Sequence, residues 1–418
     1  MSFSATERRM RESTFSFYHP LRSAPRVVGK TLRIALWKIR ESCAGRVQGT
    51  GSRRVRRYLT ALLLLALPAA AEEIRIELSR GKAAASVDAP GARLMQGGRP
   101  IELPGSRHTL LARAGALLVD GRTLSGGEPL IVYPGEGRLR VDQRPLPGRL
   151  EVWADARGLL LVNALDLEDY VAAVVASEVP KDWPEAALEA QAVAARTFAV
   201  AQKIAQGPAA RAHLGSSVLD QVYAGAAHPA SGALSAAHAT AGEVLTYGAA
   251  PIAAYFSASC GGRSETGEDA FNLAAGTTPY LVSEEDDADA GRAWVVRKPL
   301  AQISAALRKA GRVLAPVTSV RVSARTGSGR ARTLLLDTPS GERSLAAVEL
   351  RQMLGYEALP SLLFAVSVEG TDAVFRGRGN GHGVGLCQWG ARARAVRGES
   401  YRQILAHYYP GSEVRRMY

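Results

Sequence analysis

Residues 165–207 read LDLEDYVAAVVASEVPKDWPEAALEAQAVAARTFAVAQKIAQG, and this stretch predicts two consecutive helices. The first helix begins after Asp166, whose side chain caps an acidic first turn, and it ends before Pro180. The second helix takes Asp182 as its cap and ends at Gly207, a residue type that commonly stops helices. The centre of the chain is therefore predicted to be helical.

Strand-like segments flank these helices. Residues 72–145 alternate short β-type runs with glycine-rich turns, which favours a small β-rich module for support or binding. A hairpin is expected over 149–163, and further helices and strands are expected around Ala233–Ala241, Glu243–Tyr247, Ile252–Ser257, Leu300–Ala310, Leu345–Leu354 and Leu363–Val368. The elements do not alternate as βαβ units, so the predicted fold is α+β, with the β-rich module at 72–145 and a mixed α+β catalytic domain at 146–418.

The positive charge of the chain is concentrated at its beginning. The 418 residues carry a formal net charge of +13, but residues 1–71 hold 14 Lys and Arg against 3 Asp and Glu. The remaining residues hold 38 basic and 36 acidic side chains, so the folded part is nearly neutral. Nucleic-acid binding is disfavoured because neutralising phosphates requires a basic face on the folded domain itself.

Residues 53–71 have the order of a secretory signal. Basic residues precede a short apolar run, and small residues follow it, which predicts cleavage after Ala71 and a mature chain that begins at Glu72. Because such signals usually lie near the start of a chain, translation is expected to begin near Val47 or Val55. The expected location is the periplasm, the cell wall or the outside of the cell, with a membrane tether if the signal is uncleaved.

Glu178 is the candidate catalytic residue. Leu167, Tyr170, Val171, Val174 and Val175 share one face of the first helix. Glu178 continues this face in the last turn, where a carboxyl group is poorly solvated and near the negative end of the helix dipole. Both conditions favour the protonated form that a general acid needs. Two structural alternatives remain open: the side chain escapes to solvent, or it pairs with Arg196.

Glycine occupies every second position from Gly377 to Gly385. The spacing matches neither a P-loop nor the dinucleotide-binding fingerprint. Alternating glycines leave one face of an extended segment without side chains, so that a ligand or another backbone segment can approach closely. His382 is expected to protrude from this strip into a cleft, and the alternative is a structural histidine.

The cysteines outside the leader are Cys260 and Cys387, and three states remain open for them: one disulfide, two buried thiols or part of a metal site. A thiol nucleophile is disfavoured, because closeness in sequence to His382 is weak evidence for a catalytic pair. A zinc site drawn from His213, Cys260, His382 or Cys387 lacks any paired ligand spacing. The acidic run at 284–287 has no calcium-loop pattern and is expected to be a solvated loop.

Four ordered segments of the chain resemble the stage II sporulation protein D/LytB family. They are Leu165–Thr197, which contains Ser177-Glu178-Val179-Pro180; Asp220–Gly225, which reads DQVYAG; Tyr255–Gly262 with Glu265 after it; and the GHGVGLCQWGA segment that ends at Ala391. The resemblance covers roughly residues 146–412. Residues 72–145 are similar to a variable N-terminal extension in that family.

The resemblance implies a peptidoglycan lytic transglycosylase. Glu178 matches the position of the family's catalytic acid. The expected substrate-binding or supporting residues are Gln191, Arg196, Tyr255, His382 and Gln388. In that chemistry one carboxyl group protonates the glycosidic oxygen between N-acetylmuramic acid and N-acetylglucosamine. It then takes a proton from the C6 hydroxyl of the sugar, which gives a 1,6-anhydro product.

The LytB name in the family also implies an alternative, a non-catalytic enhancer that binds a cell-wall amidase and peptidoglycan. The expected partners are therefore peptidoglycan glycan strands and a cell-wall amidase or another wall-remodelling protein. Some family members bind zinc through a Cys/His cluster just before the Gln-Val-Tyr block, but His213–Asp220 contains no cysteine. No metal and no cofactor are expected, and a zinc or thiol hydrolase has only scattered residues to support it.

Overall fold

The computed structural model describes residues 72–418, except for 125–126, 136, 217–220, 222, 224, 226–230, 290–291 and 313–314. The predicted signal at 53–71 lies outside the described residues, as do Asp220, Val222 and Ala224 of the DQVYAG block. Among the described residues, no helix combines the length and apolar character that crossing a membrane requires.

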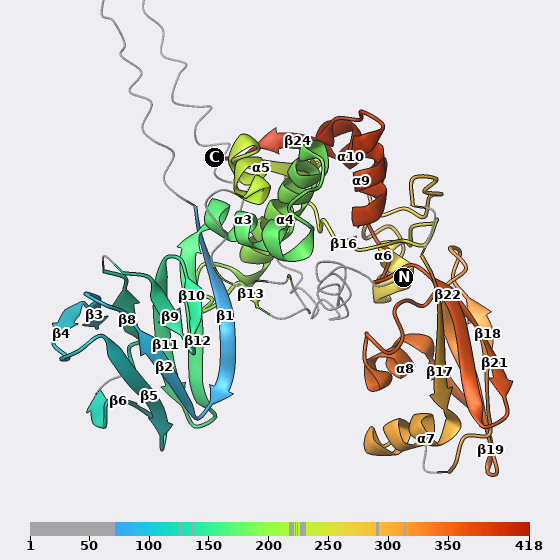
Figure 1. Ribbon diagram of the computed structural model, residues 1–418, viewed down its shortest axis with the longest axis horizontal. Helices are drawn as coiled ribbons and strands as arrows, with labels where there is room; N and C mark the ends of the chain where they lie inside the picture. Colours follow the sequence, from blue (N-terminus) through green and yellow to red (C-terminus); the bar gives the residue numbers. More distant parts are fainter. Residues whose placement is uncertain are drawn as a thin grey trace, which may run out of the picture. The chain divides into compact units, whose positions relative to one another are not determined.

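The N-terminal strands form two sheets, drawn in blue and green in Figure 1. One sheet has the order β13-β1-β12-β11-β8-β3-β4, and the other has the order β10-β9-β2-β5-β6-β7. The bounds are β1 Glu73–Lys82, β2 Ala84–Asp88, β3 Arg93–Gln96, β4 Arg99–Ile101, β5 Arg107–Arg113, β6 Ala116–Val119, β7 Arg122–Leu124, β8 Leu130–Tyr133, β9 Leu139–Val141, β10 Arg144–Leu146, β11 Arg149–Asp155, β12 Gly158–Asp166 and β13 Leu214–Gly215. Burial alternates along strands such as β8, which is typical of a sheet with one face in the core.

The predicted boundary between residues 145 and 146 falls inside this β-rich region. β11 and β12 form the predicted hairpin, with Glu151 opposite Val162. β12 also pairs with β1, where Asn163 lies opposite Ile76, and β11 pairs with β8. The boundary does not separate two sheets, because strands from both sides of it share one hydrogen-bonded ladder and one apolar core.

Three helices follow, α3 (Leu167–Glu178), α4 (Glu185–Gln206) and α5 (Gly232–Ala239). The predicted N-cap of α3 is confirmed, since the Asp166 side chain accepts hydrogen bonds from two backbone N–H groups of the first turn. The predicted Asp182 cap of α4 is wrong: Pro184 occupies that position and caps without a side-chain hydrogen bond. Proline, with its φ fixed near the helical value, is well suited to the start of a helix. The predicted stop at Gly207 is confirmed.

The C-terminal residues return to this helical layer. The elements are β14 (Glu243–Tyr247), β15 (Ala250–Pro251), β16 (Phe256–Ser257), α6 (Gly267–Phe271), β23 (Leu386–Cys387), α9 (Gln388–Val396), α10 (Tyr401–Tyr408) and β24 (Glu413–Arg416). β14 pairs with β15 and β24, and β16 pairs in parallel with β23. Helices α9 and α10 pack against α4, and the first residue of α9 reaches the end of α3 and the N-terminal part of α4.

A second apolar core lies between residues 293 and 378. It contains β17 (Ala293–Pro299), α7 (Leu300–Lys309), β18 (Ser319–Arg325), β19 (Ala331–Thr338), β20 (Gly341–Ala346), α8 (Ala347–Leu354), β21 (Phe364–Glu369) and β22 (Asp372–Arg378). Helices α7 and α8 and strand β21 confirm three predicted elements, although Leu345 belongs to β20. The fully buried side chains of this core include Ile303, Leu334 and Phe375. The mixed α+β class is confirmed.

Candidate functional site

Glu178 is the last residue of α3, and its side chain is 5% exposed. The Nε2 amide of Gln388, the first residue of α9, donates to Glu178 Oε2 at 3.3 Å. The same nitrogen donates to Oε1 of Gln191 on α4 at 3.4 Å. Three helices thus bring a carboxyl group and two amides together in the interior.

The sequence of α3 places Glu178 in this position. The predicted apolar stripe is confirmed, because Leu167, Tyr170, Val171, Val174 and Val175 are all completely buried. The helix ends where the chain turns extended before a proline, a residue that disfavours helical geometry in the position before it. The carboxyl group therefore continues the buried face, and the alternative in which it escapes to solvent is wrong.

Two amide atoms beside Glu178 have no hydrogen-bond partner within the part of the chain that the structure describes. Gln388 turns its Nε2 toward two acceptor oxygens, which leaves Gln388 Oε1 without a hydrogen bond. Gln191 Nε2 is also buried without a partner among the described residues. Each such group costs about 1–3 kcal/mol, and buried polar groups of this kind require an explanation such as a ligand. The site therefore offers one donor and one acceptor to a polar ligand.

Arg196 is fully buried, and its ion pair is with Glu168 on α3 rather than with Glu178. Arg196 Nε donates to Glu168 Oε1 at 2.9 Å, and the Gly242 N–H and the Tyr418 hydroxyl donate to the same oxygen. Burial raises the pKa of the Glu168 carboxyl, but Arg196 and these donors lower it overall, so that Glu168 is ionised near neutral pH. The alternative that pairs Glu178 with Arg196 is wrong.

Tyr255 and His382 lie in one buried aromatic cluster. Their ring centroids are 6.0 Å apart, and the Phe271 ring packs against both. Burial, with the charges of Arg351 and Arg330, lowers the pKa of His382 to about 3, so the imidazole is neutral at physiological pH. The expectation that His382 protrudes into a cleft is wrong, because its side chain is 4% exposed.

The glycine-rich strip at 377–385 is covered by the protein itself. A Cβ on Gly385, whose φ is +66°, would lie 2.1 Å from the carbonyl oxygen of Tyr255. A Cβ on Gly379 would lie 2.8 Å from the carbonyl oxygen of Ser259. Of the two occupants left open by the sequence, a ligand or another backbone segment, the structure shows the backbone segment.

A pair of tryptophans adjoins the carboxyl site and was missed by the sequence analysis. The rings of Trp183, in the turn between α3 and α4, and Trp389, next to Gln388, meet edge to face with centroids 5.2 Å apart. The guanidinium carbon of Arg292 lies 4.0 Å from the centroid of the Trp389 ring, and that of Arg392 lies 5.5 Å from it. The sequence did offer one indication of this pair, because each tryptophan lies within one of the four segments that resemble the family.

The histidines of the proposed zinc set do not meet the cysteines. Among the described residues, the group that can hold a metal ion consists of Cys260, Asp289 and Cys387. His213 instead accepts a hydrogen bond from a backbone N–H of β1, and burial together with nearby cations lowers its pKa to about 4. Burial raises the pKa of the Cys387 thiol well above its usual value, the opposite of what a nucleophile needs.

The acidic run at 284–287 is only partly solvated. Asp286 is 2% exposed and accepts hydrogen bonds from the Tyr408 hydroxyl at 2.7 Å and from Arg394 at 3.4 Å. The expectation of a solvated loop is therefore wrong for Asp286, although Asp287 and its two glutamate neighbours are exposed. The tyrosine and arginine that bury this carboxylate come from α9 and α10, more than a hundred residues further along the chain.

A cavity of about 440 Å³ lies in the second core region, where its lining includes Trp294, Arg325, Arg376 and Arg378. Glu178, Gln191 and Gln388 do not line it. The carboxyl site is thus defined by buried polar side chains rather than by this cavity.

Comparison with known proteins gives matches over most of the described chain. A family model described as stage II sporulation protein matches residues 155–247, and a model described as a domain of unknown function matches residues 280–385. The stage II sporulation protein D of Bacillus amyloliquefaciens is 32% identical over 269 residues, which cover 60% of this chain and 75% of that protein.

Two further relatives differ in how much of their length is matched. An uncharacterised protein of Brachyspira hyodysenteriae is 31% identical, with 61% of this chain and 68% of that protein covered. The amidase enhancer of Bacillus subtilis is 28% identical, with 58% of this chain but only 39% of that protein covered. With the family model, and with relatives above 30% identity matched over more than two thirds of their length, the chain belongs to the stage II sporulation protein D/LytB family.

Proposed function

We propose that this protein is an exported lytic transglycosylase that cleaves peptidoglycan glycan strands, with Glu178 as its acid and base. The observation that carries the proposal is the buried Glu178 carboxyl group between two glutamines, Gln191 and Gln388, whose amides keep one donor and one acceptor unpartnered. Membership of the family, and relatives named stage II sporulation protein D and amidase enhancer, support a role in the cell wall.

The chemistry requires one carboxyl group. Protonated Glu178 gives its proton to the glycosidic oxygen, and the resulting carboxylate then takes the proton of the C6 hydroxyl as O6 closes on C1. Because the nucleophile belongs to the substrate, the second carboxylate of ordinary glycoside hydrolases is not needed. Gln388 Nε2 donates to one oxygen of Glu178 at 3.3 Å, which helps to hold the carboxyl group in place for the proton transfers.

Neighbouring side chains suit a glycan carrying carboxyl groups. The open amide atoms of Gln191 and Gln388 can bind hydroxyl or acetamido groups of the sugar. Trp389 follows Gln388 directly, and its amphipathic ring offers an apolar face to a sugar ring. Arg292 and Arg392 beside this ring can bind the carboxylates of muramic acid or of stem peptides.

The decisive experiment compares Glu178→Gln with the unchanged protein on purified peptidoglycan, with products identified by mass spectrometry. Glutamine keeps the size and can still accept from Gln388, but it cannot exchange the proton. Anhydro-sugar formation should fall by roughly 10² to 10⁴. The matched control is Glu189→Gln, the same change at a partly exposed residue of α4, which should keep full activity. Full activity of the Glu178 variant would remove Glu178 as the catalyst.

A second candidate function is the enhancement of a cell-wall amidase, which the relative named amidase enhancer favours. If the protein acts only in this way, it releases no anhydro sugars alone. It then increases the release of stem peptides by an added amidase. The Glu178→Gln variant increases this release as much as the unchanged protein does. The same mass spectra separate the two functions, because one yields anhydro sugars and the other yields free peptides.

A further inference from the structure

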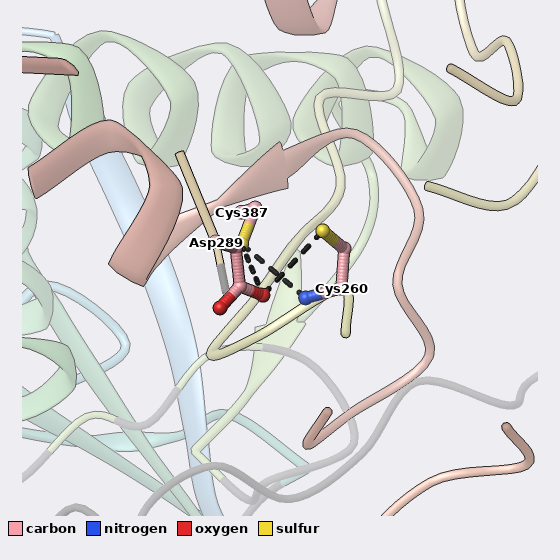
Figure 2. Close-up of side chains that lie close together, drawn as sticks. All are labelled: Cys260, Asp289 and Cys387. Atoms are coloured by element: carbon pink, nitrogen blue, oxygen red, sulfur yellow. Dashed lines mark hydrogen bonds between the residues drawn. The ribbon is translucent and has the colours of Figure 1, made fainter. Parts of the chain in front are cut away.

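Two cysteines and one aspartate meet at a fully enclosed point near the start of α9. Figure 2 shows dashed lines from one carboxylate oxygen of Asp289 to the sulfurs of Cys260 and Cys387. These oxygen-to-sulfur distances are 3.5 Å and 3.4 Å, and the three ligand atoms all lie within 4.8 Å of one another. The exposed fractions are 1%, 5% and 0% for Cys260, Asp289 and Cys387.

The spacing of these atoms suits one tetrahedral metal ion. With Zn–S bonds of about 2.3 Å and Zn–O bonds of about 2.0–2.2 Å, a sulfur and an oxygen on the same zinc ion lie about 3.5 Å apart. Both observed oxygen-to-sulfur distances agree with this value. Two thiolates with a carboxylate are a donor set that zinc accepts readily.

Further hydrogen bonds hold the donor atoms in place. Cys387 Sγ accepts from the backbone N–H of Cys260 at 3.2 Å and from that of Gly390 at 3.4 Å. Asp289 Oδ2 accepts from the Gly261 N–H at 2.9 Å and from the Ser259 hydroxyl at 2.6 Å. Donors that point at ligand atoms stabilise their anionic forms and fix their orientation, as outer-shell partners do around protein-bound metals.

We propose that Cys260, Asp289 and Cys387 bind one zinc ion. Asp286, whose Oδ2 lies 3.5 Å from Cys260 Sγ, borders this group without belonging to it, because the same oxygen accepts from the Tyr408 hydroxyl. Binding displaces the protons of both thiols, because zinc is held by thiolates. A disulfide would consume the same two sulfurs but would leave the Asp289 oxygen against a neutral bridge, whereas a zinc ion uses all three groups.

The sequence-based expectation of no metal rested on the lack of a paired ligand spacing and of a cysteine in residues 213–220. The two cysteines are 127 residues apart and meet only because β16 pairs with β23. The proposal does not rest on the proposed function, because the metal content is read without any activity. Its structural consequence is that zinc fixes Cys387 at the start of α9 and thereby the neighbouring Gln388.

The test measures zinc in the full chain, purified in a reducing buffer without chelator from cells supplied with zinc. Elemental analysis should find about one zinc ion per chain. Cys387→Ser and Asp289→Asn should each weaken zinc binding by more than the roughly 10- to 100-fold that removal of an outer-shell partner costs. Asp287→Asn, the same change at an exposed acidic residue close in sequence to Asp289, is the matched control and should keep the zinc.

A second measurement is independent of the variants, because a serine variant can lose its fold along with the metal. Cobalt(II) in place of zinc in the unchanged chain should show the thiolate-to-metal absorption and the strong visible bands of a four-coordinate site. Zinc retained in both ligand variants would overturn the proposal. So would a metal-free chain in which the thiols of Cys260 and Cys387 both react after denaturation, or a chain lighter by two hydrogens, as a disulfide requires.

Discussion

Replacing Glu168 by glutamine should lower the thermal stability of the protein without removing the chemistry of Glu178. Glu168 is the ion-pair partner of Arg196, whose side chain is completely buried, and it also accepts from Gly242 and Tyr418. Breaking a buried pair from one side costs about 3–5 kcal/mol, because the other charge stays uncompensated. A glutamine oxygen still accepts from Arg196, so we expect about 3 kcal/mol, the lower end of this range.

The corresponding change in melting temperature follows from the size of the chain. At about 2.1 cal/mol/K of unfolding entropy per residue over roughly 350 residues, each kcal/mol shifts Tm by about 1.4 °C. The Glu168→Gln variant should therefore melt about 4 °C below the unchanged protein near neutral pH, measured by calorimetry.

The loss of stability in the Glu168→Gln variant should depend on pH. The folded-state pKa of Glu168 is lowered relative to its unfolded value, because Arg196 and the other donors outweigh burial. Its contribution is fully present above the unfolded pKa of about 4.3 and is lost as the pH falls through the folded value. The gap in Tm between the two proteins should stay constant down to about pH 5, begin to narrow near pH 4.3 and close only below the lowered folded-state pKa.

Glu178→Gln supplies the contrasting result. Relieving a desolvated carboxyl group that is kept for function should leave Tm unchanged or slightly raised, while anhydro-sugar formation is lost. The Glu168 variant should show the reverse, a lower Tm with activity kept below its melting range. Equal drops in Tm for both variants, or a Glu168 gap that does not narrow as the pH falls below about 4.3, would refute the assignment of the Arg196 charge to Glu168.

Three further outcomes are expected. In the unchanged protein, His382 should cost about 2 kcal/mol of unfolding free energy as the pH falls from 6.5 to 5, because the unfolded histidine binds a proton there while the folded one, with a pKa of about 3, does not. His382→Phe should remove this loss in urea unfolding. An unchanged dependence of the unfolding free energy on pH would contradict this. Gly385→Ala should lower Tm more than Gly398→Ala. Both glycines have positive φ, but only the added Cβ of residue 385 would clash with a neighbour, the Tyr255 carbonyl oxygen. Equal decreases in Tm would mean that backbone strain alone causes the effect. N-terminal sequencing of the secreted protein should begin at or near Glu72, and a full-length cytosolic chain would show that the signal does not act.

The sequence predicted the elements that depend on local chemistry. The start of α3 follows from the Asp166 side chain reaching N–H groups two and three residues away, and its end follows from Pro180. The apolar stripe is a property of spacing within this one helix, so it placed Glu178 correctly in the interior. Helix α4 was also found, although its cap was assigned to Asp182 because a side-chain cap is the commoner start.

The errors concern partners that are distant in sequence. Arg196 could pair with either glutamate of α3, and the choice depends on Gly242 and Tyr418, which reach Glu168 from the other end of the chain. In the sequence Asp286 belongs to a charged run that predicts an exposed loop, but in the structure Tyr408 and Arg394 donate hydrogen bonds to it and bury it. The second core was not separated from the first, because its strands carry the same apolar alternation as the others. Spacing along a chain reports one helix or strand well, but not which helices and strands meet.

The beginning of α9 connects the two proposals physically. Cys387 caps α9 by accepting from the Gly390 N–H, and the next residue, Gln388, reaches Glu178. A zinc ion on Cys387 would hold this cap rigidly, and the Gln388 amide would keep its place between two acceptor oxygens even when no sugar fills the remaining positions. Gln388 Oε1 and Gln191 Nε2 are buried without hydrogen-bond partners among the described residues, which is energetically unfavourable. Without zinc, the Gln388 side-chain amide can therefore rotate toward another arrangement of hydrogen bonds. Removing Cys387 should therefore disturb the environment of Glu178, even though no sulfur takes part in the proton transfers.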